Sequence, residues 1–283
     1  MAITAQAVKA LRDRTGAGMM DCKKALTETN GDMDEAVKFL RTKGLAAAAK
    51  KAGRAANDGM ITIVGDDKKK AILELNCETE PVSKLGDFRG FGDDLVQQVL
   101  DSGAQSADEL KAQPFAGDPG HTVEQMVSLK VAVIGENIVL NQCALIEAAP
   151  GNSLASYVHM GGKIGVVVEG SGGASAEALH DVALHVAAAE PRFVTRDEVT
   201  DDLLATEREI ALKQSMEQGK SEEIAQKIVE GKMEKFFVSE VLLEQPFAKD
   251  SNVSVGEYLK ANSGKDATVV RFVRYKLGEG SGE

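Results

Sequence analysis

The side chains in this sequence that could do chemistry are scattered and match no familiar catalytic or metal-binding motif. Cys22, Cys77 and Cys143 lie far apart without a CxxC pair, so we expect neither a zinc site nor a disulfide framework. His180 and His185 lie five residues apart on a predicted helix, which does not match the spacing of zinc proteases. The sequence therefore offers no positive indication of an enzyme, and an unrecognised one would need a polar pocket that no motif announces.

A glycine-rich segment at residues 161–165 raises the question of nucleotide binding, because glycine-rich loops can cradle phosphates. This segment precedes a predicted strand instead of joining a strand to a helix, and it lacks the spacing of a phosphate-binding loop. We therefore expect no nucleotide site there and no cofactor.

Binding surfaces are better indicated than catalysis, first of all at residues 76–82, which read Asn-Cys-Glu-Thr-Glu-Pro-Val. Here a predicted strand ends in a polar tip. Pro81 fixes its own backbone and favours an extended conformation for Glu80. Such a preorganised acidic and apolar tip could insert into a partner protein, although an ordinary strand-to-helix turn explains the pattern equally well.

Residues 12–26 contain a second candidate, in which a Thr-Gly-Ala-Gly hinge is followed by Met19 and Met20. Neighbours on a helix point about 100° apart, so we expect one methionine in a small helical core and the other exposed. Burying a methionine stabilises by roughly 1.5–3 kcal/mol, so an exposed one invites a protein contact. The alternative is that both methionines belong to the core of the bundle.

Composition limits the classes of partner. The net charge is −11, which argues against broad binding to nucleic-acid phosphates. Aromatic residues make up 4% of the 283 residues and tryptophan is absent, so stacking platforms for single strands are not expected. Because the sequence shows no signal peptide and no apolar run of membrane-spanning length, we expect a cytoplasmic protein with no membrane partner.

The elements that must position these residues indicate an α+β fold in three parts. Helical patterns at 4–14, 19–30 and 32–44 predict a three-helix domain, and an alanine-rich helix at 45–52 is interpreted as a semi-rigid linker. Strands and helices then follow twice over, which predicts two related halves with antiparallel sheets. The expected domains are 1–53, 54–137 and 138–283.

The third part includes two long helical patterns at 201–218 and 221–236. We expect them to form an antiparallel coiled-coil hairpin spanning about 195–237. The apolar side chains expected along its seam are Leu203, Leu204, Ile210, Ile224, Ile228 and Met233. A hairpin that cannot bury both of its sides suggests self-association or a partner.

Together these stretches resemble the bacterial elongation factor Ts family along nearly the whole chain. The similar segments are residues 11–26, 48–53, 74–79, 134–138, 159–166, 185–188, 245–247 and 273–280. The resemblance implies a ubiquitin-associated-like three-helix domain, a two-part core and a coiled-coil dimerisation insert. It also implies a guanine-nucleotide exchange factor that binds elongation factor Tu with GDP and promotes GDP release by disturbing the magnesium and phosphate site.

The resemblance assigns residues to that role. Arg12, Met19 and Met20 would dock on the GTPase, while residues 79–82 correspond to a Thr-Asp-Phe-Val tip that intrudes beside the magnesium. Contacts at His159 and Met233 would hold a second lobe of the partner. The remaining alternative is a protein-binding module, of a ubiquitin-associated-like or chaperone type, without exchange activity.

The sequence departs from the family pattern at the tip, Thr79-Glu80-Pro81-Val82. Glu80 keeps the charge of the family aspartate with a longer reach. Pro81 replaces the family phenylalanine, so an aromatic wedge is lost and less apolar area can be inserted. Family members usually continue into a further helix beyond the position of Gly280, so we expect some partner surface to be missing here.

Overall fold

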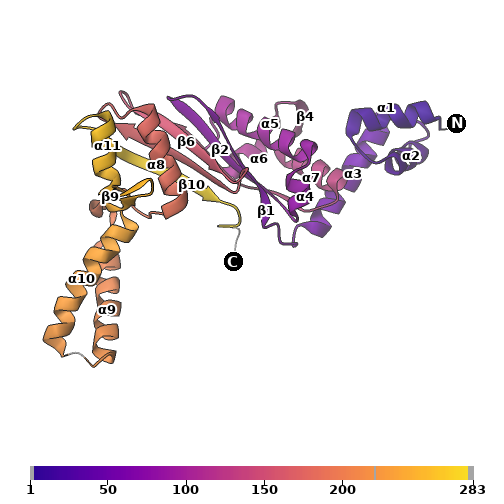
Figure 1. The fold of residues 1–283 in the computed structure, drawn as a ribbon. Helices are drawn as coiled ribbons and strands as arrows, with labels where there is room; N and C mark the ends of the chain where they lie inside the picture. The colour runs from indigo at the N-terminus through magenta and orange to yellow at the C-terminus, as the bar shows by residue number, and fades with distance from the viewer. Residues whose placement is uncertain (1–2, 220, 280–283) are drawn as a thin grey trace.

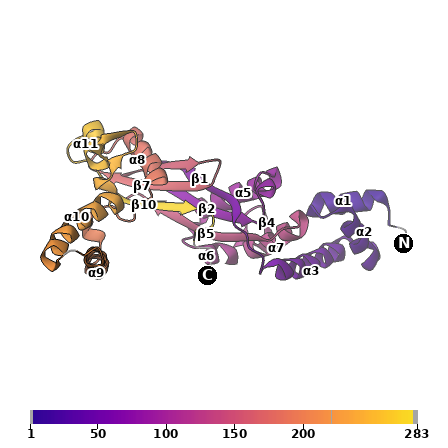
Figure 2. The same cartoon turned by 60° about the horizontal axis from the view of Figure 1, so that its bottom comes forward.

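The computed structural model describes residues 3–219 and 221–279, so the family motif at Gly280 ends outside the described residues. A three-helix bundle lies at one end, a core of two sheets in the middle, and a helical hairpin at the other end (Figures 1 and 2). The predicted α+β class with antiparallel sheets is confirmed. None of the helices in the described residues is long and apolar enough to cross a membrane.

The bundle consists of α1 (Ala5–Thr15), α2 (Met19–Glu28) and α3 (Met33–Lys51). The residues at which two of the predicted patterns begin cap their helices: Thr4 Oγ1 accepts from the Ala7 amide at 3.2 Å, and Asp32 accepts from the Glu35 amide at 2.9 Å. The small core of the bundle is formed by the buried side chains of Val8, Leu11, Cys22, Ala25, Leu26, Ala36 and Leu40.

Helix α3 corrects the predicted boundary at residue 44. We expected a helix that stops near Gly44 and a separate linker helix, but one helix runs through both segments. Gly44 is buried because α3 packs there against α7 (Val123–Ile134); a Cβ at Gly44 would lie 3.3 Å from Leu129 Cδ2. The glycine costs roughly 1 kcal/mol of helix propensity, which this close packing offsets. The supposed linker is therefore a packed element of the core.

The first sheet has the order β1-β2-β5, formed by β1 (Asp58–Gly65), β2 (Lys69–Cys77) and β5 (Ile138–Glu147). Its helix-covered face buries side chains of α5 (Gly86–Ser102), α6 (Ala107–Ala112) and α7. The expected boundary between residues 137 and 138 stays a prediction, but β5, which follows it, pairs with β2 of the first sheet. Between α6 and α7 the chain forms a small ribbon of β3 (Pro114–Phe115) and β4 (Asp118–Thr122).

The second sheet has the order β10-β7-β6, formed by β6 (Ser153–His159), β7 (Ile164–Ser171) and β10 (Thr268–Lys276). Its helical cover consists of α8 (Ala176–Ala189) and α11 (Val255–Ser263), and the ribbon beside them pairs β8 (Pro246–Phe247) with β9 (Asp250–Ser254).

The two sheets pack against each other through their remaining faces. A separate cluster of buried side chains joins them: Ile61, Ile72, Ile146, Leu154 and Val167. Gly165 permits the close approach, since a Cβ there would lie 2.5 Å from Ile61 Cγ2. The core is therefore layered as helices, sheet, sheet and helices, and the turn between β6 and β7 is brought against β1.

The hairpin of α9 (Asp201–Glu217) and α10 (Glu222–Glu240) protrudes from the core (Figure 1). Its predicted seam is partly wrong, because Ile210 and Ile224 are 44% and 51% exposed. Met233 of the predicted seam is buried, and so are Phe237 and three small residues, Ala211, Ser215 and Ala225. The seam therefore combines small and large side chains, while Ile210 and Ile224 lie outside it.

Candidate partner-binding site

The tip at residues 79–82 begins where β2 ends. Thr79 is extended, and a short helix, α4 (Glu80–Ser83), follows it. Our expectation of an extended Glu80 is therefore wrong. Pro81 fits in the first turn of this helix because a residue there donates no backbone hydrogen bond within the helix. The Thr79 carbonyl accepts hydrogen bonds from the amides of Val82 and Ser83 at 3.1 and 3.2 Å.

Glu136, in the loop after α7, holds the tip in place. Its carboxylate accepts the amides of Glu78 and Thr79 at 3.1 and 3.0 Å, and the Thr79 hydroxyl at 2.6 Å. In return Glu78 accepts the amide of Asn137 at 2.6 Å. The sequence does not reveal the role of Glu136, although the segments 74–79 and 134–138 both resemble family motifs. The structure joins these two segments into one site.

The charge of the tip is carried by Glu80, whose carboxylate is solvent-exposed and lies 2.9 Å from Lys84 Nζ. The hydrogen bond and charge of Lys84, followed by the charge of Lys163, lower the pKa of Glu80. The carboxylate is therefore anionic at neutral pH, and it is exposed to solvent beside its ion pair with Lys84.

Only one of the two apolar side chains predicted at the tip, Pro81 and Val82, is exposed. Pro81 is exposed, but Val82 is half-buried and packs against the core of the first sheet. The next exposed apolar side chain is Leu85, which directly precedes α5 and is 46% exposed. Pro81 and Leu85 therefore offer apolar surface at the tip, while Val82 anchors it.

Cys77 lies directly beneath the tip and is fully buried. Its thiol donates to the Thr79 carbonyl at 3.3 Å, and burial raises its pKa to about 12. A thiol in this state is not a nucleophile at neutral pH, so Cys77 has a structural role.

In the bundle, Arg12, Met19 and Met20 are all exposed. Met19 is 46% and Met20 is 74% exposed, so neither is buried in the bundle core, and both of our expectations about this pair are wrong. Cys22 and Leu26 fill the small core in their place. The structure therefore presents two neighbouring apolar side chains on the surface of α2.

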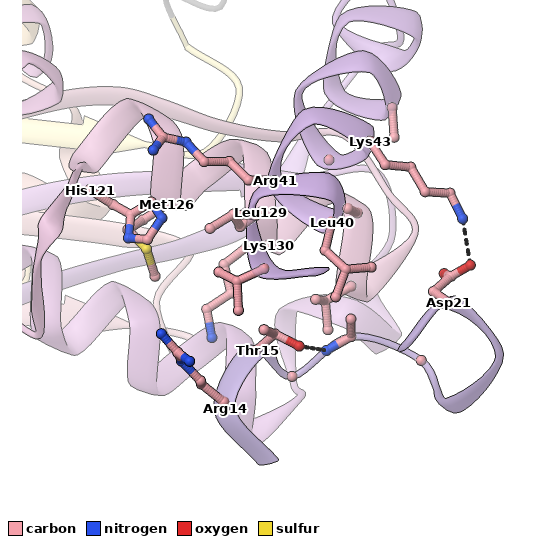
Figure 3. A pocket seen from close by; sticks show the side chains of 18 of the residues that line it. Arg14, Thr15, Asp21, Leu40, Arg41, Lys43, His121, Met126, Leu129 and Lys130 are labelled. Atoms are coloured by element: carbon pink, nitrogen blue, oxygen red, sulfur yellow. Dashed lines mark hydrogen bonds and ion pairs between the residues drawn. The ribbon is translucent and has the colours of Figure 1, made fainter. Parts of the chain in front are cut away.

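A groove of about 690 Å³ separates the bundle from the core beside the contact of α3 with α7. Figure 3 shows Arg14, Arg41 and Lys130 lining one part of it, whereas the ion pair of Asp21 with Lys43 lies apart from them. Leu40, Met126 and Leu129 supply apolar lining. Asp87 and Asp118 also line the groove, so its wall carries apolar side chains and charges of both signs.

The two remaining predicted contacts lie in different surroundings. His159 ends β6, is half-buried, and its Nδ1 lies 2.9 Å from the Tyr157 hydroxyl. Met233 is only 5% exposed and contributes to the packing inside the hairpin, so its own side chain offers little surface to a partner. The hairpin and the bundle lie at opposite ends of the molecule (Figure 1), so the structure does not bring all predicted contacts into one patch.

An elongated α+β chain that presents an acidic tip, an exposed pair of methionines and a protruding hairpin has the construction of a protein-binding factor. The family model described as elongation factor TS matches residues 78–279, which include the whole tip. An elongation factor Ts from Trichlorobacter lovleyi is 43% identical to this chain, over 99% of this chain and 94% of that relative. The chain therefore belongs to the elongation factor Ts family and is a translation elongation factor that acts as a nucleotide exchange factor.

Proposed function

We propose that the chain binds elongation factor Tu in its GDP-bound form and accelerates the release of GDP, so that GTP can rebind. Membership of the elongation factor Ts family supports this partner. By linkage, a factor that binds the nucleotide-free GTPase most tightly must weaken its affinity for GDP by the same ratio. The chain needs no catalytic site or cofactor of its own for such an effect, and we place it in the cytoplasm, where translation occurs.

The tip at residues 79–82 is our candidate for the group that disturbs the magnesium and phosphate site. Its support is the rigid hold of Glu136 on Thr79, which leaves Glu80 and Pro81 exposed at the end of a fixed turn. Magnesium bridges nucleotide phosphates to the GTPase, so a carboxylate placed beside it would compete for the metal or repel the phosphates. This tip is the single observation that carries the proposal.

Arg12, Met19 and Met20 would dock a second part of the GTPase on the bundle, which we propose to be ubiquitin-associated-like. Their exposure supports this role, because two adjacent exposed methionines have no function in the bundle core. The groove of Figure 3 lies next to this surface, between α2, α3 and α7, and would receive the same partner. His159 and the surroundings of Met233 would contact another lobe.

The hairpin is the candidate surface for self-association as a coiled coil. Ile210, Met216 and Ile224 are 44%, 50% and 51% exposed, and together they place apolar surface on the outside of α9 and α10. A homodimer, or a complex of two copies with two GTPases, would cover them. We expect no direct contact with nucleic acid, because the net charge is −11.

The test is the release of a fluorescent GDP from preloaded elongation factor Tu, followed over time with and without this chain. Acceleration at micromolar protein is the expected result. Binding without acceleration would favour the second candidate, a binding module that uses the bundle alone. The exposed methionines of α2 are the observation that favours this second candidate. Absence of acceleration would overturn the exchange mechanism proposed for the tip.

A further inference from the structure

Met160, in the turn between β6 and β7, combines two properties that do not favour folding. Its side chain is 71% exposed, although it is large and apolar. Its φ angle is 48°, in the left-handed region that residues with a Cβ adopt reluctantly. Strained backbone of this kind persists where surrounding structure enforces it, and it is concentrated at functional sites.

The turn that carries Met160 is fixed by its backbone. The amides of Gly162 and Lys163 donate to the His159 carbonyl at 3.1 and 3.0 Å, and the Gly162 carbonyl accepts the Ile61 amide of β1 at 2.7 Å. A Cβ at Gly162 would lie 3.1 Å from Ile61 O, so glycine permits this close approach. Met160 is therefore held outward by a rigid turn.

Arg89, on α5, connects this turn to the tip. Its Nε donates to the carbonyl of Ser83, the last residue of α4, at 3.1 Å, and its Nη2 donates to the Gly161 carbonyl at 3.1 Å. The guanidinium group is planar and its donors have a fixed geometry. One side chain thus sets the spacing between the short helix of the tip and the turn that carries Met160.

Two further observations agree with the link that Arg89 makes between the tip and the turn. The charge of Lys163, in the turn, reaches Glu80 and contributes to the lowering of its pKa. Leu85, which precedes α5 one turn before Arg89, is 46% exposed, so apolar surface also lies beside the link made by Arg89.

We propose that the tip (79–82) and the β6–β7 turn (159–163) form one preorganised two-point contact for the GTPase. In it Met160 is the apolar anchor of the second point, and Arg89 is the positioning residue that fixes the distance between the points. The occupant is the same GTPase that meets the tip, because Arg89 makes the two surfaces continuous, and this inference therefore rests on the proposed function. A rigid pair of contacts loses less conformational entropy on binding than two independent loops.

The first test is Met160→Gly, measured by equilibrium binding to nucleotide-free elongation factor Tu. Glycine tolerates the positive φ, so the thermal midpoint should be unchanged or higher. Loss of the apolar anchor should weaken binding about tenfold. The matched control is Val270→Ala, which truncates a side chain that is 42% exposed at the far end of the second sheet, on β10. This control should bind as the wild type does.

The second test is the positioning role of Arg89. Arg89→Lys keeps the charge but loses the fork, so the maximal rate of GDP release should fall about tenfold. In that background Met160→Gly should cost less binding than in the wild type, because the two points are no longer held in register. A purely structural role of Arg89 would lower the thermal midpoint and leave the Met160→Gly effect unchanged.

The outcomes separate this inference from the function on which it rests. If the wild type accelerates GDP release and Met160→Gly binds within about twofold of it, the two-point contact is overturned and the exchange function stands. Strict additivity of the Arg89 and Met160 variants would likewise overturn the positioning role alone. If the wild-type chain neither binds the GTPase nor accelerates the release of GDP from it, both the two-point contact and the proposed function are overturned.

Discussion

Gln98 and His185 occupy equivalent places in the two halves of the core. Gln98 Oε1, on α5, accepts the Ala116 amide at 2.9 Å, and His185 Nδ1, on α8, accepts the Ala248 amide at 3.1 Å. Each amide follows a Pro-Phe pair that opens a two-stranded ribbon, and each ribbon leads into a helix with a capping box. This correspondence supports the interpretation of the core as two related halves.

His185→Gln should make the stability of the protein less dependent on pH. Burial lowers the pKa of His185 below its usual value of 6.5. The unfolded chain therefore binds a proton at His185 more readily than the folded protein does. The contribution of His185 to stability is fully present above pH 6.5 and is lost as the pH falls toward the folded-state pKa. The loss is at most about 1.4 kcal/mol per pH unit.

Urea unfolding at pH 7.5 and 5.5 measures this effect. The glutamine variant should lose less stability between the two pH values, since Gln98 shows that an amide can fill the equivalent place. His180→Gln, at an exposed position of α8, is the control. If the free energy of unfolding changes equally with pH in the wild type and in the His185 variant, protonation of His185 is not a cause of this pH dependence.

Gly44→Leu should separate α3 from α7. A Cβ at this position lies 3.3 Å from Leu129 Cδ2 and 3.5 Å from Ala132 Cβ, so a larger side chain overpacks the contact and costs about 1–3 kcal/mol. Gly231→Leu on α10 is the control, because its Cβ meets open space and leucine should add up to about 1 kcal/mol of helix propensity. Unfolding in urea checks both; an unchanged Gly44 variant would refute the close packing.

Glu136→Ala should release the tip. It removes the acceptor of three hydrogen bonds to Glu78 and Thr79, so the amides of these residues should exchange hydrogen faster. The maximal rate of GDP release should fall by about tenfold or more, because the tip loses its orientation. Glu124→Ala, in the first turn of α7, removes a carboxylate elsewhere and serves as the control. If the Glu136 variant shows faster hydrogen exchange at the tip but an unchanged rate of GDP release, preorganisation of the tip is not what accelerates the release.

Pro81→Phe should raise the rate of GDP release. Pro81 is exposed, so a phenylalanine there adds an aromatic group to the inserted tip without displacing a core side chain. Pro81→Ala adds no such group and should give no increase. The measurement is stopped-flow release of fluorescent GDP, and an unchanged or lower rate for the phenylalanine variant would count against the wedge.

Met20→Ala should weaken binding of the GTPase and leave folding intact. The side chain is 74% exposed, so the free energy of unfolding should change by less than about 0.5 kcal/mol. Affinity should fall about 5- to 30-fold if the methionine is buried in the complex. Leu26→Ala, in the bundle core, should instead destabilise by about 2–5 kcal/mol. Isothermal titration calorimetry measures the affinity. If Met20→Ala binds the GTPase as tightly as the wild type does, the proposed contact of α2 with the GTPase is wrong.

Local signals in the sequence were enough to predict most helices and strands. The helical patterns predicted at 4–14 and 32–44 begin at Thr4 and Asp32, which cap the two helices; a capping side chain and its amide are only three residues apart. The hairpin of β1 and β2 is likewise a local feature, because a short turn joins its two apolar strands. The motifs of the sequence also indicated the elongation factor Ts family, to which the chain belongs.

What the sequence alone determined about this protein is therefore its elements, its class and its family. Only the tertiary structure decided how residues 78–79 meet Glu136, how α3 continues through Gly44, and which methionines are exposed. The physical reason is that each of these outcomes depends on partners distant in sequence. Periodicity shows that one side of a helix is apolar, but it does not show whether Met20 or Met233 finds another element to cover it.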